Sequence, residues 1–146
     1  MQLPSAWSLE RLLSITIPVE KTNPQKNGEG FFQYIDIASV DNDKKEISMV
    51  KLISNRDAPS RARQLILCGD VLVSTVRPNL NAVALVPNDL DGSICSTGFC
   101  VLRANPQKIH AKYLYHWVKS AYFVDSISAL ARGAGYPAVS ERDIAA

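Results

Sequence analysis

The sequence predicts an α+β fold: a compact, twisted, mainly antiparallel β-sheet unit with a C-terminal helix or helix pair packed on it. Three observations predict it. Short apolar runs separated by turn residues fill the middle of the chain. The apolar period then lengthens to that of a helix after Asn105-Pro106. Finally, 146 residues with 47% hydrophobic and 21% charged side chains suit one globular domain, which we expect to span 1–146.

The first half of the chain contains one clear strand signal. A short helix or strand is expected around 7–17, followed by a loop rich in Asn, Pro and Gly. Residues 31–38, FFQYIDIA, are aromatic and β-branched and therefore predict a strand, with a turn at 41–43. Residues 51–64 are polar and include Pro59, so we expect loop there instead of regular structure.

The apolar runs of the middle region predict further strands. Residues 65–76 predict one or two buried strands around a turn at Gly69-Asp70. Residues 82–86 (AVALV) predict another strand and residues 88–92 (NDLDG) a turn. Residues 94–103 (ICSTGFCVLR) predict the next strand, so the region reads as a β-rich unit with tight connections.

Residues 111–131 predict one helix, or two helices broken near Ser120, packed on the sheet. The helical period is followed by Leu114, Trp117, Val118, Ala121, Val124, Ile127 and Ala131. The segment Arg132-Gly133-Ala134-Gly135 suits a helix C-terminus, because glycine tolerates the left-handed cap and arginine complements the helix dipole.

The cysteines and histidines predict no metal site, and no cofactor is expected. Cys68, Cys95 and Cys100 each lie in an apolar run and are expected to be reduced core thiols. Their spacing lacks the close Cys pairs that zinc sites use. His110 and His116 are six residues apart, which places them on different faces of a helix.

Enzyme signatures are not found in the sequence. It contains no P-loop, no GxGxxG after a strand, no GxSxG elbow, no HExxH and no (N/D)PP(Y/F) tetrapeptide. A hydroxyl of the Ser96-Thr97-Gly98 segment could in principle act as a nucleophile. We expect instead that its hydroxyls bond neighbouring backbone groups and that Gly98 allows close packing. No catalytic residue is therefore predicted.

Positive charge is concentrated in one stretch, although the net charge of the chain is only +2. Residues 51–77 carry five basic and two acidic side chains, and four of the five are arginine. The planar guanidinium fork makes paired hydrogen bonds to phosphate or to guanine edges. Asparagine can pair with adenine, and Ser60 and Gln64 add short hydrogen-bonding groups beside the arginines.

A second stretch with binding potential is RGAGYPAVS at 132–140, whose glycines could bring backbone amides to a phosphate. The alternatives are ordinary: a solvated arginine loop with weak surface ion pairs, and a helix stop followed by a turn. The candidate DNA-binding residues are Arg56, Ser60, Arg61, Arg63, Arg77, Asn79, Asn81, Arg132 and Tyr136.

The chain resembles the target-recognition domain of type I restriction–modification specificity subunits. The resemblance is carried by YIDIASVD (34–41), DAPSRARQLILCGDVLVSTVRPNLNAVALV (57–86), ICSTGFCVLRA (94–104) and YLYHWVKSAYFVDSISALARGAGYPAVSERDI (113–144). The opening LPSAWSLERL (3–12) is also similar to the usual entry of the family. The order of these motifs is more specific than any one of them.

The resemblance implies a module that reads double-stranded DNA and is not itself an enzyme. Family members carry two recognition domains and helical spacers, and partner modification and restriction subunits methylate adenine and cleave DNA. This chain ends at Ala146, where a spacer would begin, so we expect a half-subunit, an excised domain or a truncated product. We assign phosphates to Arg61, Arg63 and Arg132. Base edges are assigned to Arg77, Asn79, Asn81 and Tyr136.

Three other readings stay open on the sequence. The domain could belong to a fused methyltransferase–nuclease, its arginines could bind an acidic protein, or Ser96 or Thr97 could serve a small hydrolase. No apolar run approaches the roughly 20 residues of a membrane helix, and the N-terminus lacks a signal-peptide layout. A cytoplasmic protein without membrane contact is therefore expected.

Overall fold

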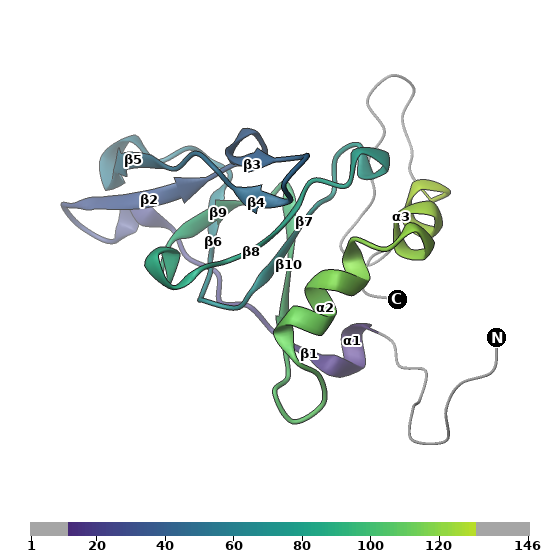
Figure 1. Cartoon of the computed structure of the whole chain (residues 1–146). Helices are drawn as coiled ribbons and strands as arrows, with labels where there is room; N and C mark the ends of the chain where they lie inside the picture. The colour runs from purple at the N-terminus through teal and green to yellow at the C-terminus, as the bar shows by residue number, and fades with distance from the viewer. Residues whose placement is uncertain (1–11, 131–146) are drawn as a thin grey trace.

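The computed structural model describes residues 12–130, which form two packed sheets with a helix pair on the outer face of one of them (Figure 1). The first sheet is antiparallel, in the order β1 (Thr16–Ile17), β10 (Phe99–Ala104), β7 (Val71–Ser74), β8 (Val83–Leu85). The second has the order β5 (Lys51–Ser54), β2 (Phe31–Ile35), β9 (Ile94–Ser96), β6 (Ala62–Leu65), and only β2 and β9 run parallel.

Short elements connect these strands. A two-stranded ribbon is formed by β3 (Val40–Asp41) and β4 (Glu46–Ile47). The helices are α1 (Leu12–Ile15), α2 (Ala111–Val118) and α3 (Ala121–Ser128). Single 3-10 turns are η1 (Pro24–Lys26), η2 (Ile37–Ser39), η3 (Asn55–Asp57), η4 (Pro78–Leu80) and η5 (Asn88–Leu90). The predicted α+β class, with a mainly antiparallel sheet unit and C-terminal helices, is confirmed.

Strand β7 lies at the centre of the molecule and is buried on both faces. Val71 and Val73 pack in the core that the first sheet shares with α2 and α3. Leu72 points the other way, into the core between the two sheets, where it joins Ile35 and Phe99. Strands buried on both faces read as continuous apolar runs, which is why this segment was recognisable in the sequence.

Of the two alternatives that the sequence left open, one helix or two broken near Ser120, the structure has the two helices. The Ser120 hydroxyl accepts a hydrogen bond from the Phe123 backbone N–H at 3.3 Å and so caps α3. Leu114 and Val118 of α2 are fully buried, and Phe123 and Ile127 of α3 are nearly so. These four side chains attach the helices to the first sheet. The predicted helix end at 132–135 lies outside the described residues.

The prediction that residues 51–64 are loop is wrong, because they contain all of β5 and most of β6. Strand β5 is an edge strand with much of its surface exposed, and β6 alternates buried and half-buried residues. Strands that face solvent carry polar side chains, so their composition resembles that of a loop. Pro59 lies in the connection between η3 and β6, where it breaks no ladder.

Residues 94–103 form two strands and not the one that was predicted. The chain leaves the second sheet after Ser96 and enters the first at Phe99. Gly98 stands at this crossing, and a Cβ there would come within 3.3 Å of both the Ile37 side chain and the Ser96 Oγ. The glycine is therefore needed for close packing, as the sequence indicated.

Other boundaries shift as well. The strand predicted at 31–38 ends at Ile35, and the turn at 41–43 is confirmed by backbone bonds to the Asp41 carboxylate. Within 65–76 only residues 71–74 and Leu65 are in strands, on either side of the predicted Gly69-Asp70 turn.

Cysteine placement was predicted correctly at two positions of three. Cys95 and Cys100 are buried in the two cores. Cys68 is exposed, because it lies in the connection between β6 and β7, where its N–H donates to the Asp91 carboxylate at 2.7 Å.

No helix within residues 12–130 has the length and apolarity required to cross a bilayer.

Candidate nucleic-acid interface

Backbone hydrogen bonds bring the arginine-bearing ends of β6 and β7 to the same edge of the molecule. The Thr97 N–H donates to the Arg61 carbonyl at 2.9 Å. The Thr75 N–H and hydroxyl both donate to the Gly98 carbonyl, each at 2.9 Å. Arg77 follows two residues after Thr75. The turn between β9 and β10 therefore joins the residue before β6 to the end of β7, about one interstrand spacing from each, and Arg77 begins the loop that follows.

The buried Gln64 side chain stabilises the β9–β10 turn through hydrogen bonds to both of its ends. Gln64 is 1% exposed, and its amide donates to the Ser96 carbonyl at 2.9 Å and to the Phe99 carbonyl at 3.0 Å. Its Oε1 accepts from the Lys21 ammonium at 2.9 Å. The sequence suggested that Gln64 could reach DNA, and this is wrong, because the amide is buried and holds the passage between the two sheets.

The loop after β7 has an unusual backbone. Arg77 (φ +47°) and Asn81 (φ +51°) flank the η4 turn, and both adopt left-handed conformations. Lys45 (φ +56°) is the third such non-glycine residue among residues 12–130, and its side chain reaches the same loop. Left-handed backbone is unfavourable for residues with a Cβ, and it persists only where surrounding contacts hold it.

Those contacts are visible around η4. The Asn81 Nδ2 donates to the Val118 carbonyl at the end of α2, at 2.9 Å. The Lys45 ammonium donates to the carbonyls of Asn81 at 2.7 Å and Leu80 at 3.3 Å. Burial lowers the pKa of Lys45, although Asp43 nearby acts in the opposite direction. The loop is therefore tied both to a helix and to the β3–β4 turn.

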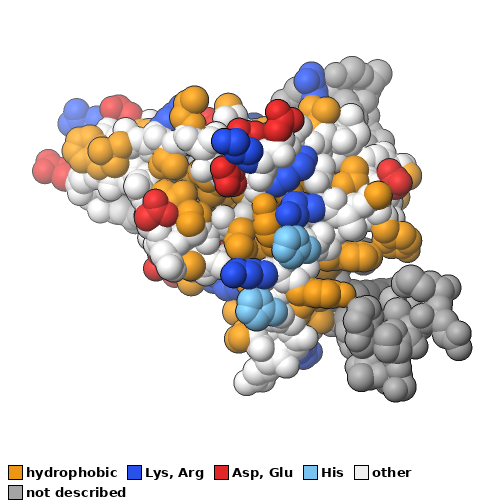
Figure 2. Space-filling model, viewed as in Figure 1, with side chains coloured by type: hydrophobic (Ala, Val, Ile, Leu, Met, Phe, Trp, Pro, Cys, Tyr) orange, Lys and Arg blue, Asp and Glu red, His pale blue; other side chains and the backbone are white. Residues whose placement is uncertain are grey.

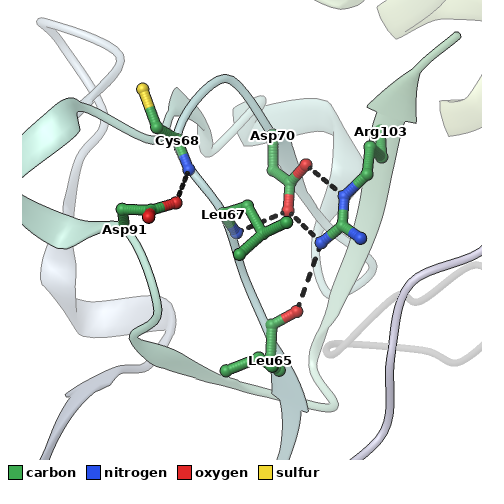
Figure 3. Close-up of polar contacts among 6 residues, drawn as sticks. All are labelled: Leu65, Leu67, Cys68, Asp70, Asp91 and Arg103. Atoms are coloured by element: carbon green, nitrogen blue, oxygen red, sulfur yellow. Dashed lines mark hydrogen bonds and ion pairs between the residues drawn. The ribbon is translucent and has the colours of Figure 1, made fainter.

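An ion pair anchors the start of β7, at the opposite end of the strand from the η4 loop (Figure 3). Asp70 is 1% exposed, and the Arg103 Nε donates to its Oδ1 at 2.8 Å and Nη2 to its Oδ2 at 2.9 Å. The Leu67 N–H also donates to Asp70, at 2.9 Å, and Arg103 Nη2 reaches the Leu65 carbonyl at 3.4 Å. Hydrogen bonding to Asp70 raises the pKa of Arg103. The β6–β7 connection is held at both ends.

The predicted contact residues on this edge differ in exposure. Ser60, Arg61, Arg77 and Asn79 are exposed, whereas Arg63 is half-buried with its Nη1 on the Ala62 carbonyl at 3.0 Å. Neither Arg61 nor Arg63 is paired with a carboxylate within the described part of the chain. Both guanidinium groups thus keep donors for an anion.

Of the other four predicted residues, Asn81 is engaged within the fold, Arg56 lies elsewhere, and two fall outside the described residues. Asn81 is 8% exposed and its amide is bonded to Val118, so it supports the loop from below. Arg56 is exposed on η3, after Ser54, which pairs with the first residue of β2. Arg61 precedes Ala62, the first residue of β6, which pairs with Ser96 at the end of β9. Because β9 runs parallel to β2, Arg56 and Arg61 lie towards opposite ends of the second sheet. Arg132 and Tyr136 fall outside residues 12–130.

Sequence reasoning missed the supporting residues of the edge. Lys45, Thr75 and Thr97 hold or line it, and nothing in their local sequence indicates this role. The Ser96 nucleophile reading is contradicted, because Ser96 is 2% exposed and its Oγ accepts a hydrogen bond from the Gly98 N–H at 3.0 Å. The hydroxyl satisfies backbone, as the sequence predicted.

Comparisons with known proteins found solved structures and a curated sequence that resemble this chain. No family model matches the sequence. The chain is 43% identical to a solved HsdS subunit from Thermoanaerobacter tengcongensis, with a TM-score of 0.91 over 99% of this chain. A second solved chain, from work on complex assembly and conformational transition of the type I R-M system, is 42% identical with a TM-score of 0.94 over 99% of this chain.

The chain is a homologue of type I specificity subunits. A curated relative, the type I restriction enzyme HindI specificity subunit of Haemophilus influenzae (strain ATCC 51907 / DSM 11121 / KW20 / Rd), is 37% identical over 70 residues, 48% of this chain and 14% of that subunit. The chain spans 37% of the length of each solved relative. The resemblance seen in the sequence is therefore confirmed for a part of such a subunit.

Proposed function

We propose that this chain is the DNA-reading part of a type I specificity subunit and binds double-stranded DNA sequence-specifically. The observation that carries this proposal is the edge where the β9–β10 turn joins the exposed Arg61, before β6, to the end of β7, from which the loop with the exposed Arg77 begins. The likeness to HsdS structures over 99% of the chain supports it. A protein-interaction module or a hydrolase has no comparable support.

In this proposal the arginines at β6 contact phosphates, and the residues of the η4 loop contact bases. Arg61 and Arg63, at the start of β6, neutralise phosphates and set the register, with Ser60 beside them. Arg77 and Asn79, on the braced η4 loop, approach base edges in a groove. Asn81 positions that loop through Val118. Arg56 meets a phosphate farther along the duplex, and Arg132 and Tyr136 remain predicted contacts on the following segment.

The role extends to an assembly. In this proposal the chain reads one half of a split target, and partner modification and restriction subunits perform adenine methylation and cleavage, so the chain itself is not catalytic. A single domain with few basic groups binds weakly, and linking it to a second domain and to partner subunits adds affinity through effective concentration. Because the target is chromosomal or invading DNA, the protein acts in the cytoplasm.

Salt dependence of DNA binding tests the phosphate contacts. Arg61→Ala and Arg63→Ala should each weaken binding to any duplex and lower the slope of log K against log salt by about one, because each phosphate contact releases condensed counterions. Fluorescence anisotropy at several salt concentrations measures both. Lys26→Ala, which removes one exposed charge on η1, is the matched control. Wild-type slopes in both arginine variants would remove these two contacts from the proposal.

A further inference from the structure

Helix α2 presents a row of basic side chains that the contacts proposed above do not use. Lys112, His116 and Lys119 are spaced four and three residues apart, so they project from one face of the helix. Lys112 and His116 are exposed, and Lys119 is half-buried. Figure 2 shows Lys and His side chains in line over α2. We call these three residues the α2 stripe.

The helix dipole favours positive charge at His116 and Lys119, which lie at the C-terminal end of α2, but it does not favour Lys112. Lys112 lies in the first turn of α2, where the helix dipole favours a negative charge, and α2 contains no acidic residue. The stripe therefore has no carboxylate partner one turn away that would offset repulsion between its members. Asp43 and Glu46 belong to the β3–β4 region, and neither is ion-paired with the stripe within residues 12–130. The stripe therefore keeps N–H donors that could bind an anion.

The α2 stripe runs into the η4 loop. The carbonyl of Val118, beside Lys119, accepts the hydrogen bond from Asn81 that braces the loop. The Lys119 ammonium lies 4.2 Å from the centroid of the Tyr115 ring, which holds it near the helix surface. The end of α2 that carries Lys119 is therefore joined by a buried hydrogen bond to the loop that carries the exposed Arg77 and Asn79.

We propose that the α2 stripe binds the phosphates of one DNA strand next to the site read by the η4 loop. Seven residues of helix separate Lys112 from Lys119, a rise of about 10 Å, which matches about three phosphates at 3.4 Å of axis each. The ammonium groups neutralise phosphates, and an imidazole N–H of His116 donates to one in either charge state. This inference rests on the proposed DNA-binding function and extends its surface.

The test measures DNA binding of the full chain by fluorescence anisotropy between about 50 and 200 mM salt. Lys112→Gln and Lys119→Gln should each lower the salt slope by about one, and the double variant by about two. The affinities should fall on cognate and scrambled duplexes alike, because phosphates carry no sequence. Lys26→Gln, which removes the same charge far from α2, should keep the wild-type slope, and thermal melting should show all variants folded.

Three other results would overturn the proposal, and they are distinguishable. If Arg61→Ala lowers the slope while the double variant keeps the wild-type slope, the edge binds DNA and the α2 stripe does not. If the double variant binds DNA normally but no longer binds the modification subunit, the stripe recognises an acidic protein surface. If the wild-type chain shows no salt-dependent DNA binding at all, the proposed function and this inference both fail.

Discussion

Two 3-10 turns, each following a strand and each bearing an exposed arginine, differ in how they are held. The η3 turn with Arg56 is capped by Ser54, has ordinary backbone angles and lies at the edge strand of the second sheet. The η4 turn with Arg77 has left-handed residues at both ends and side-chain bonds from Lys45 and Asn81. An exposed arginine alone does not distinguish the two turns, and the strained and braced backbone at η4 is the reason that we propose the reading role for Arg77 and not for Arg56.

The buried Asp70–Arg103 ion pair, at the opposite end of β7 from η4, should give the largest effect on stability. Asp70→Ala leaves Arg103 without its buried partner, and we expect a loss of about 3 kcal/mol of unfolding free energy. Urea denaturation measures it. Asp57→Ala in the η3 turn removes an exposed carboxylate that bonds Ser54, and it should change stability by less than about 1 kcal/mol. Equal effects of the two substitutions would contradict the expected difference between a buried ion pair and an exposed carboxylate.

The two arginines should differ in what they contribute to DNA binding. Arg77→Ala should reduce affinity by about 1–3 kcal/mol on the cognate duplex and much less on a scrambled one, because a base contact is lost. Arg56→Ala should weaken both duplexes equally and by a smaller amount. Competition binding with the two duplexes measures the ratio. An equal loss of affinity for both duplexes in Arg77→Ala would contradict a base contact by Arg77.

Two substitutions at Asn81 separate the effect of its hydrogen bond to Val118 from the effect of its left-handed backbone. Asn81→Ala should lower the unfolding free energy by about 1–2 kcal/mol, through the hydrogen bond lost at Val118 and the left-handed backbone imposed on alanine. Asn81→Gly keeps the backbone freedom and loses only the amide, so it should be the milder variant. Thermal denaturation ranks them. Alanine and glycine variants of equal stability would show that the positive φ contributes nothing.

The smallest expected effect concerns the exposed ion pair beside β5. Burial acts to raise the pKa of Asp36, but hydrogen bonds from Lys51 and Ser39 outweigh it and the pKa is lowered. A carboxyl whose pKa is below its unfolded value of about 3.9 stabilises the fold above that pH, and the contribution disappears as the pH falls through the folded pKa. Being largely solvent-screened, it amounts to less than about 1 kcal/mol.

Lys51→Ala tests this pair directly. The pKa of Asp36 should rise towards its ordinary value, and the variant should lose less stability than the wild type as the pH falls below about 4. Carboxyl chemical shifts followed by NMR through the acid range measure the pKa. An unchanged pKa would mean that Ser39 alone holds the carboxylate.

Sequence patterns recovered the buried elements better than the exposed ones. Val71–Ser74 is apolar on both faces, and the helix break at Ser120 has a capping hydroxyl, so both were evident locally. Strands β5 and β6 were missed because half of their side chains meet solvent and their composition imitates a loop. At the candidate site, the arginines were found by type, but Gln64 and Asn81 were misread because polarity does not reveal burial.

The sequence by itself determined the α+β class, the order of the buried segments and the concentration of arginine before and after β7. Hydrophobic period, turn residues and capping groups act between near neighbours in the chain, so they can be read along it. Only the tertiary structure decided that the β9–β10 turn joins the residue before β6 to the end of β7, that Lys45 and Asn81 brace η4, and that Asn81 bonds the last residue of α2. These relations depend on pairings between residues far apart in the chain, which no local pattern encodes.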